Sequence, residues 1–179
     1  ETSAAAASIF QEVHTIELSA ELAQKAMQRF SADDRVHVYQ GDSTDVLDAI
    51  IPRLTRRSVF WLDGHYSEGI TAKGRCNTPI LDEINALARH GATDHVLLID
   101  DISLFRGPRD ASNASSSLHG YPSVRALCDA IMAVNPEYKF AVVGDVAFAL
   151  PPILGVSVSP FIQACTISRL FECEEGDDQ

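Results

Sequence analysis

Apolar residues along this chain fall into short runs typical of strands and longer stretches with helical spacing. Strand patterns cover residues 13–18, 36–39, 58–62, 95–99, 138–143 and 146–150. Between them, apolar side chains recur three or four positions apart, which predicts helices over residues 4–10, 20–30, 44–54, 79–90 and 124–134. Because strands and helices alternate, we expect an α/β fold with a mostly parallel sheet and helices on both faces.

Capping and turn residues refine these boundaries. Ser19 suits the N-cap of the second helix. Gly144-Asp145, between the last two strand patterns, predicts a tight antiparallel hairpin. Residues 160–171 can form a terminal helix, and residues 172–179 form an acidic tail. We therefore predict a single domain over residues 1–171, followed by a frayed end.

The most informative stretch begins with the apolar run Val59–Leu62. An unbroken run of this kind is typical of a parallel strand that is buried on both faces. It ends on Asp63-Gly64-His65-Tyr66, and the strand His95–Ile99 likewise ends on Asp100-Asp101. In an open α/β sheet, ligands bind beyond the carboxyl ends of the strands. These two strand ends are therefore where we expect the functional site.

Composition and charge narrow the classes of function. The chain has 179 residues, of which 46% are apolar, and this is enough for one domain with a sizeable core. Its net charge of −11 argues against nucleic acid as a partner. Its apolar runs are too short for a membrane span. The cysteines lack zinc-site spacing and indicate free thiols, so we expect a cytoplasmic protein, with a homo-oligomer compatible with the sequence.

Acids at the first two strand ends are candidates for binding a nucleoside cofactor. Glu17 lies where an acid accepts hydrogen bonds from the ribose hydroxyls of an adenosine-type cofactor. Asp42 and Ser43 lie one strand later, where an adenine amino group can find an acceptor. Each position has a structural alternative. Glu17 can be a solvated acid beside the Ser19 cap, and Asp42-Ser43 can be a turn in which Ser43 or Thr44 caps the next helix.

Asp63, Asp100 and Asp101 form the sharpest constellation in the sequence. Carboxylates at adjacent strand ends supply the oxygen ligands that Mg²⁺ prefers, and a metal there would lower the pKa of a substrate hydroxyl. The alternative is that the paired acids cap loops and bind nearby arginines. His65, with an ordinary pKa near neutrality, is a candidate general base, or else a loop histidine without a role.

Two long loops are expected to shape a substrate pocket. Residues 64–77 contain three glycines, and residues 103–120 are rich in Ser, Asn, Gly and Pro without periodicity. The candidates for lining an acceptor pocket are Tyr66, Thr71, Thr78 and Glu83. Glu83 can equally be an ordinary helix charge. Phe105 and Tyr121 flank the second loop and are either a cover for substrate or packing residues.

Taken together, four segments resemble a known family. The motifs VHTIELS, QGDS, FWLDGHYSEG and LLIDDI resemble the class I S-adenosylmethionine-dependent methyltransferases. They are nearest to the small-molecule and sugar O-methyltransferases of the macrocin O-methyltransferase type. The resemblance covers about Thr2 to Pro151. It implies a Rossmann-like sheet that ends in an antiparallel hairpin, and that hairpin separates the methyltransferase fold from the dehydrogenase fold.

For the cofactor, the resemblance implies that Glu17 binds the ribose of S-adenosylmethionine and that Asp42 and Ser43 lie near its adenine. The glycine-rich loop that precedes the first helix in this family is not in this sequence. Only its far end is present, as Thr2 and Ser3. Both suit the N-cap of the first helix, where free backbone N–H groups can hold a carboxylate.

For the chemistry, the resemblance implies that Asp63 borders the cofactor. In the metal-dependent members, Asp63, Asp100 and Asp101 would hold Mg²⁺. Those members usually carry a second acid where this chain has His65. A histidine base is therefore the rival of a metal at this position.

The leading hypothesis is an enzyme that transfers a methyl group from S-adenosylmethionine to a hydroxyl of a small molecule or sugar. Asp63 and His65 would activate the hydroxyl. A nicotinamide-dependent oxidoreductase shares the acid at Glu17, but the terminal strand pair and the lack of a Tyr-x-x-x-Lys motif argue against it. A third reading is a non-catalytic domain of a larger protein that keeps the fold without the cofactor loop.

Overall fold

Alternating strands and helices form an α/β structure. The computed structural model describes residues 2–63, 78–105 and 121–152. The helices are α1 (Thr2–Ala7), α2 (Ala20–Arg29), α3 (Ser43–Ile50), η1 (Ile51–Arg53), α4 (Ile80–Arg89), η2 (Ile102–Leu104) and α5 (Val124–Val134). The strands are β1 (Val13–Glu17), β2 (Val36–Gln40), β3 (Val59–Leu62), β4 (Val96–Ile99), β5 (Lys139–Val143) and β6 (Val146–Leu150). The predicted alternation of elements is confirmed.

The strands form two sheets among the described residues. β1 and β2 pair in parallel, and the second sheet has the order β3-β4-β6-β5. Within it, β3 and β4 are parallel, whereas β6 runs antiparallel to both β4 and β5. The predicted hairpin is confirmed, and Gly144 at its turn has a φ of 63°, which favours glycine. The sequence predicted one mostly parallel sheet. The structure instead leaves β1 and β3 as separate sheet edges.

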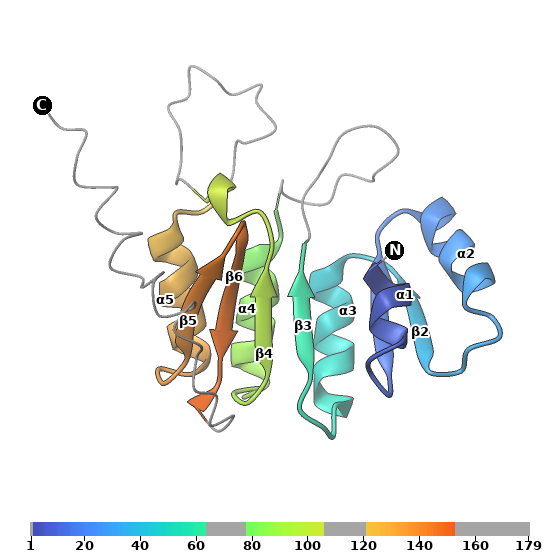
Figure 1. Ribbon diagram of the computed structural model, residues 1–179, viewed down its shortest axis with the longest axis horizontal. Helices are drawn as coiled ribbons and strands as arrows, with labels where there is room; N and C mark the ends of the chain where they lie inside the picture. The colour runs from blue at the N-terminus through green and yellow to red at the C-terminus, as the bar shows by residue number, and fades with distance from the viewer. Residues whose placement is uncertain (1, 64–77, 106–120, 153–179) are drawn as a thin grey trace, which may run out of the picture.

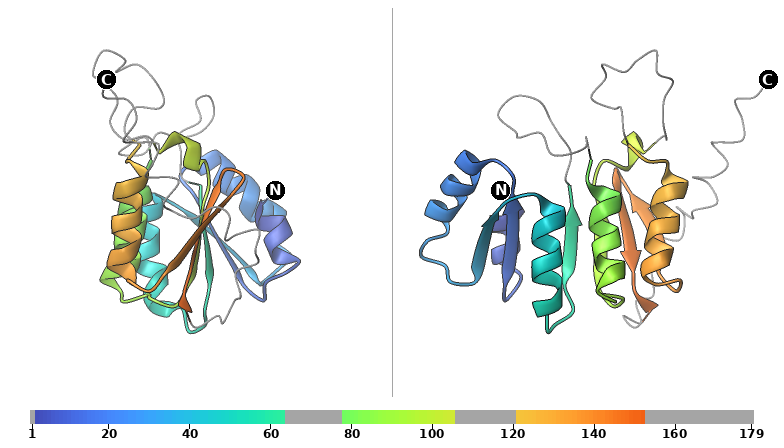
Figure 2. Two further views of the ribbon diagram at one scale, coloured as in Figure 1. Left: turned by 60° about the vertical axis from the view of Figure 1, so that its left-hand side comes forward. Right: turned by 180° about the vertical axis from the view of Figure 1, so that it is seen from behind.

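Helices α3, α4 and α5 cover one face of the four-stranded sheet, as the front and rear views show (Figures 1 and 2). The core lies in this layer. Its largest fully buried side chains are Ile84, Leu87, Leu97, Ile99, Leu127 and Ile131. They come from α4, β4 and α5, whose apolar residues recur at helical or strand spacing. The hydrophobic pattern therefore predicted the main core layer.

The opposite face of the four-stranded sheet carries no described helix (Figure 1). Val59 and Trp61 point to this face and are 40% and 45% exposed. Trp61 is aligned across the sheet with Leu98 and Phe148, so an apolar row crosses three strands. The expectation that β3 is buried on both faces is therefore wrong for the described residues. Only its Leu62 side reaches the core, because α1 and α2 contact the small sheet instead.

Some helix ends differ from the prediction. α1 spans Thr2–Ala7 rather than residues 4–10, so Thr2 and Ser3 lie inside it instead of capping it. The chain leaves the helix through a turn in which both Ile9 and Phe10 donate backbone hydrogen bonds to the carbonyl of Ala6. α4 begins at Ile80, and the residue at its N-cap position is Pro79, which has no side-chain donor or acceptor.

None of the described helices is both long and apolar enough to cross a lipid bilayer. The predicted terminal helix over residues 160–171 and the acidic tail lie outside the described residues. So do most of the two predicted loops, which the structure describes only up to Asp63 and Phe105 and again from Thr78 and Tyr121.

Candidate functional site

The carboxyl ends of β2, β3 and β4 lie along the same edge of the molecule (Figure 1). β1 is parallel to β2, so its end belongs to that edge as well. An acid follows or ends each strand: Glu17, Asp42, Asp63 and Asp100. Strand direction therefore gathers the predicted acids on one side, as parallel topology requires. We call this row of strand ends the acidic edge.

At the first strand end, Glu17 holds the entry to α2. Its Oε1 accepts a hydrogen bond from the backbone N–H of Ser19 at 2.8 Å. The Ser19 side chain in turn accepts one from the N–H of Leu22 at 3.4 Å, which confirms Ser19 as the helix cap. The structural role predicted for Glu17 is therefore present. The ribose-binding role remains a prediction.

At the second strand end, Asp42 is the N-cap of α3. Its Oδ1 accepts a hydrogen bond from the N–H of Thr44 at 3.0 Å. The sequence assigned this cap to Ser43 or Thr44, and that assignment is wrong by one residue because the aspartate reaches the free N–H first. Gly41 precedes it with a φ of 152°, and a Cβ there would lie 3.1 Å from a methyl of Val46. The tight turn therefore requires glycine.

Ser43 is left free of the capping role, and its side chain hydrogen-bonds the Glu83 carboxyl instead. Glu83 lies in the first turn of α4 and is only 3% exposed. Burial raises its pKa to about 7, and the nearby carboxylates Asp42, Asp82 and Asp63 raise it further, while the Ser43 hydrogen bond opposes them. Among the described residues, Glu83 Oε2 has no hydrogen-bond partner.

The burial of Glu83 overturns the reading of this residue as an ordinary helix charge. The signal was present in the sequence. Ile80, Glu83, Ile84 and Leu87 are spaced as one helix face, and all four are buried. A carboxylate in the middle of an apolar stripe predicts either a partner or a bound proton.

At the third strand end, Asp63 links two buried groups. It raises the pKa of Glu83, and together with Asp101 it raises the pKa of Tyr121. Tyr121 is 5% exposed, and its pKa rises to about 12, first because the phenol is buried and then because of these carboxylates. Its ring meets that of Phe105 edge to face, with centroids 5.4 Å apart, and both belong to the core. The packing role of these aromatics is confirmed.

At the fourth strand end, the chain turns through a strained backbone. Asp101 has a φ of 56° and a ψ of 39°, in the left-handed region that non-glycine residues rarely adopt. Its N–H donates to Asp100 Oδ1 at 3.0 Å. The following η2 is held by Asp145 of the β5–β6 turn, which accepts hydrogen bonds from the N–H and hydroxyl of Ser103 at 2.8 and 2.9 Å. The hairpin therefore positions the Asp100-Asp101 turn.

The predicted metal ligands do not form a ready site. Across residues 2–63, 78–105 and 121–152, no three His, Cys, Asp or Glu side chains are arranged to hold a metal ion. Asp63, Asp100 and Asp101 share the acidic edge but do not converge on one point, so they do not fit Mg²⁺ as placed. His65, the predicted base, and the pocket candidates Tyr66 and Thr71 lie outside the described residues.

The first helix contributes to the site differently than predicted. Thr2 lies in the first turn of α1 and is exposed. The Ser3 hydroxyl donates to Thr15 Oγ1 of β1 at 3.0 Å. The observed role of Ser3 is therefore to join α1 to β1, and the cofactor contact predicted for Thr2 and Ser3 stays a prediction.

Two histidines that we expected to be structural or solvated form a network on the small sheet. Glu12 lies within 3.3 Å of His14 Nε2 and 3.1 Å of His37 Nε2. The opposite ring nitrogen of His14, Nδ1, is 3.1 Å from the Tyr39 hydroxyl. Burial lowers the pKa of His14, which favours the neutral ring. This network joins β1 to β2 and supports the structural reading.

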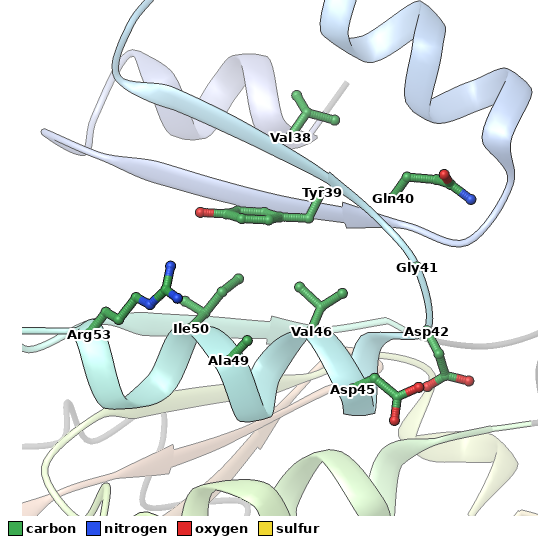
Figure 3. A pocket seen from close by; sticks show the side chains of 10 residues that line it. All are labelled: Val38, Tyr39, Gln40, Gly41, Asp42, Asp45, Val46, Ala49, Ile50 and Arg53. Carbon is green, nitrogen blue, oxygen red and sulfur yellow. The ribbon is translucent and has the colours of Figure 1, made fainter.

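A cavity of about 490 Å³ lies between β2 and α3 (Figure 3). The Tyr39 ring faces Val46 and Ile50 across it, and Asp42 lies at one end. The other lining residues are Val38, Gln40, Gly41, Asp45, Ala49 and Arg53. Glu83 and Asp63 do not line this cavity, so Asp42 is its connection to the acidic edge.

Comparison of the sequence with models of known protein families and with the sequences of curated proteins finds no match. The functional assignment therefore depends on the sequence motifs and on the geometry of the acidic edge.

Proposed function

We propose that this protein is an S-adenosylmethionine-dependent O-methyltransferase that acts on a hydroxyl of a small molecule or sugar. The observation that carries the proposal is the acidic edge, where Glu17, Asp42 and Asp63 follow parallel strands on one side of the molecule. An adenosine cofactor bound across such an edge meets acceptors for its ribose and base in strand order.

Each acid suits one part of the cofactor. Glu17 would accept hydrogen bonds from the ribose hydroxyls, and the Ser19 N–H on its Oε1 holds the carboxylate in place. Asp42 and Ser43 would lie near the adenine, where Asp42 is fixed by its capping bond to Thr44. When bound, S-adenosylmethionine supplies an electrophilic methyl group. The protein's task is then to align the acceptor hydroxyl with that methyl.

Asp63 is the proposed acceptor-side residue. It is exposed and follows β3, next to the acids of the cofactor side. Its carboxylate would accept a hydrogen bond from the substrate hydroxyl and orient the oxygen for attack. His65 is the second candidate base. Mg²⁺ has no step in this proposal, because Asp63, Asp100 and Asp101 do not fit a metal as placed.

The proposal includes a finer description of the fold. In a methyltransferase-like sheet, one more parallel strand would lie between β1 and β3, and α1 would be the crossover helix that joins it to β1. The two sheet edges support this description, since β1 pairs with β2 and β3 pairs with β4 among the described strands. The contact of α1 with β1 also supports it.

Calorimetric titration with S-adenosylhomocysteine and with NADH tests the proposal. We expect binding of S-adenosylhomocysteine and none of NADH, and a loss of affinity of roughly tenfold in Glu17→Gln. Glu21→Gln is the matched control, because Glu21 is an exposed acid that pairs with Lys25 on the outside of α2. Binding of NADH alone would favour an oxidoreductase. Binding of neither ligand, also by a polypeptide extended at the N-terminus, would favour a non-catalytic domain.

Asp63→Asn tests the acceptor side separately. We expect it to bind S-adenosylhomocysteine like the wild type but to transfer methyl groups at least roughly tenfold more slowly. A variant that methylates as fast as the wild type would rule out this role for Asp63.

A further inference from the structure

Glu83 carries a buried polar atom that the structure leaves without a partner. Its side chain is 3% exposed, and among the described residues Oε2 forms no hydrogen bond. A buried polar atom in this state is destabilising, by about 1–3 kcal/mol in typical proteins. Such atoms are rare, and they often indicate a bound ligand or water. This observation is independent of the acids at the strand ends.

The groups that face Glu83 come from three elements. Ser43 and Asp42 stand at the start of α3, Asp63 follows β3, and Asp82 is its neighbour on α4. Three of these four groups are carboxylates, and no arginine or lysine acts on Glu83. An additional negative charge is unfavourable here, so the carboxyl retains its proton near neutral pH. A protonated carboxyl presents a donor and an acceptor side by side.

This donor–acceptor pair has the complement of one particular ligand edge. The ring nitrogen and exocyclic amino group of adenine present an acceptor next to a donor. Ser43 must bond Glu83 through Oε1, since Oε2 has no partner, so Oε2 remains available. We propose that Glu83 binds the amino-pyrimidine edge of adenine, with Oε2–H donating to the ring nitrogen and Oε1 accepting from the amino group. This inference rests on the proposed function, because it assumes an adenosine cofactor at the acidic edge.

The placement of Glu83 favours this edge over other ligand groups. It adjoins Asp42 and Ser43, which are the residues at the strand end assigned to the base. A ligand cation would favour the ionised carboxylate, whereas a neutral base needs the protonated form that the neighbouring carboxylates maintain. The two possibilities predict opposite dependence of affinity on pH, so they can be separated.

The test is the affinity for S-adenosylhomocysteine, measured by calorimetry from pH 6 to pH 8.5 in four proteins. These are the wild type, Glu83→Gln, Glu83→Ala and the matched control Asp82→Asn, which neutralises an exposed acid next to Glu83. The Gln amide keeps the size, the donor and the acceptor of the protonated carboxyl but does not titrate. Thermal unfolding of each variant at pH 6 shows whether it is folded. Should Glu83→Ala fail to fold, the pH profile of Glu83→Gln still decides.

We expect the wild type to lose affinity by about 30-fold between pH 6 and pH 8.5 relative to Glu83→Gln, because the carboxyl ionises. At pH 6, Glu83→Gln should bind within about threefold of the wild type, and Glu83→Ala about 10- to 100-fold more weakly. Asp82→Asn should retain the wild-type profile.

Three results would overturn the inference. If Glu83→Gln is as weak as Glu83→Ala at pH 6, the carboxyl does not act through a donor–acceptor pair. If the wild type binds with the same pH profile as Glu83→Gln, or more tightly with rising pH, the protonated form is not the binding form. Both results leave the proposed function standing. Absence of binding by the wild type and by Asp82→Asn at pH 6 overturns the proposed function, and the adenine contact with it.

Discussion

The Ser43 side chain hydrogen-bonds the Glu83 carboxyl and thereby joins the start of α3 to the first turn of α4. At the other end of the same helix pair, Arg89 Nη2 contacts both carboxylate oxygens of Asp48 at 2.8 and 2.9 Å. The outer pair is exposed, whereas Glu83 is buried. The helix pair is therefore held at both ends, and the end that faces the acidic edge carries a titratable group in the core.

The stability of the protein should depend on pH through Glu83. Its pKa is about 7 in the folded state, against an ordinary value of 4.5. Between these values the folded state holds a proton that the unfolded state releases. The contribution of Glu83 to the free energy of unfolding is therefore fully present below about pH 4.5 and is lost as pH rises to about 7. The loss should amount to about 3 kcal/mol.

Chemical denaturation of the wild type and Glu83→Gln at pH 5 and pH 8 measures this contribution. The wild type should lose stability relative to the variant on going from pH 5 to pH 8. Equal changes in the two proteins would show that Glu83 does not hold a proton in the folded state. Asp82→Asn serves as the control, since it neutralises an exposed carboxyl next to Glu83.

Removing the Asp145 carboxylate should loosen η2 and the strained Asp101 turn. Asp145→Ala loses two hydrogen bonds to Ser103, so we expect a loss of about 1 kcal/mol and faster amide hydrogen exchange over Ile102–Leu104. Asp129→Ala is the control, because Asp129 is an exposed acid that contacts only Arg125 in the printed geometry of α5. Unchanged exchange in η2 would show that the hairpin does not hold this turn.

The core layer between α4 and the four-stranded sheet should tolerate truncation poorly. Ile84 is fully buried, so Ile84→Ala should reduce the free energy of unfolding by about 2–5 kcal/mol, and Ile84→Val by about 0.5–1.5 kcal/mol. The exposed Met132→Ala on α5 is the comparison, with an expected change of about 0.5 kcal/mol or less. Denaturant titration of the three variants measures these differences. A loss for Ile84→Ala no greater than for Met132→Ala would contradict the core assignment.

Trp61 reports on the uncovered face of the sheet. It is the single tryptophan of the chain and is 45% exposed. Its fluorescence should therefore be readily quenched by acrylamide in the folded protein. In a longer polypeptide that supplies the proposed strand between β1 and β3, quenching should decrease. Strong protection of Trp61 in this chain would show that the Val59–Trp61 face is already covered.

The sequence predicted those features that follow from local patterns. The apolar stripe of α4 and the Gly144-Asp145 turn predicted their elements correctly because spacing and backbone preference act within a few residues. The exposure of Val59 and Trp61 could not be predicted this way. An unbroken apolar run shows that a strand has two apolar faces, but the packing of distant helices decides which face is covered.

The candidate site shows the same division. Parallel strand direction placed Asp42 and Asp63 on one edge, as the sequence predicted. Whether three acids converge on a metal depends on turn geometry, here on the left-handed backbone of Asp101, which no local pattern indicated. Glu83 was misjudged as equally suited to an ordinary surface charge, although its position within the apolar stripe of α4 was visible in the sequence.

Hydrogen exchange of the protein with and without S-adenosylhomocysteine tests the central claim most directly, because it shows where the cofactor binds. The acidic edge should become protected, with slower exchange over residues 17–20, 41–44 and 80–84, while the β5–β6 strands remain unchanged. Protection confined to other segments, or no protection at a concentration where calorimetry detects binding, would contradict the assignment of the acidic edge as the cofactor site.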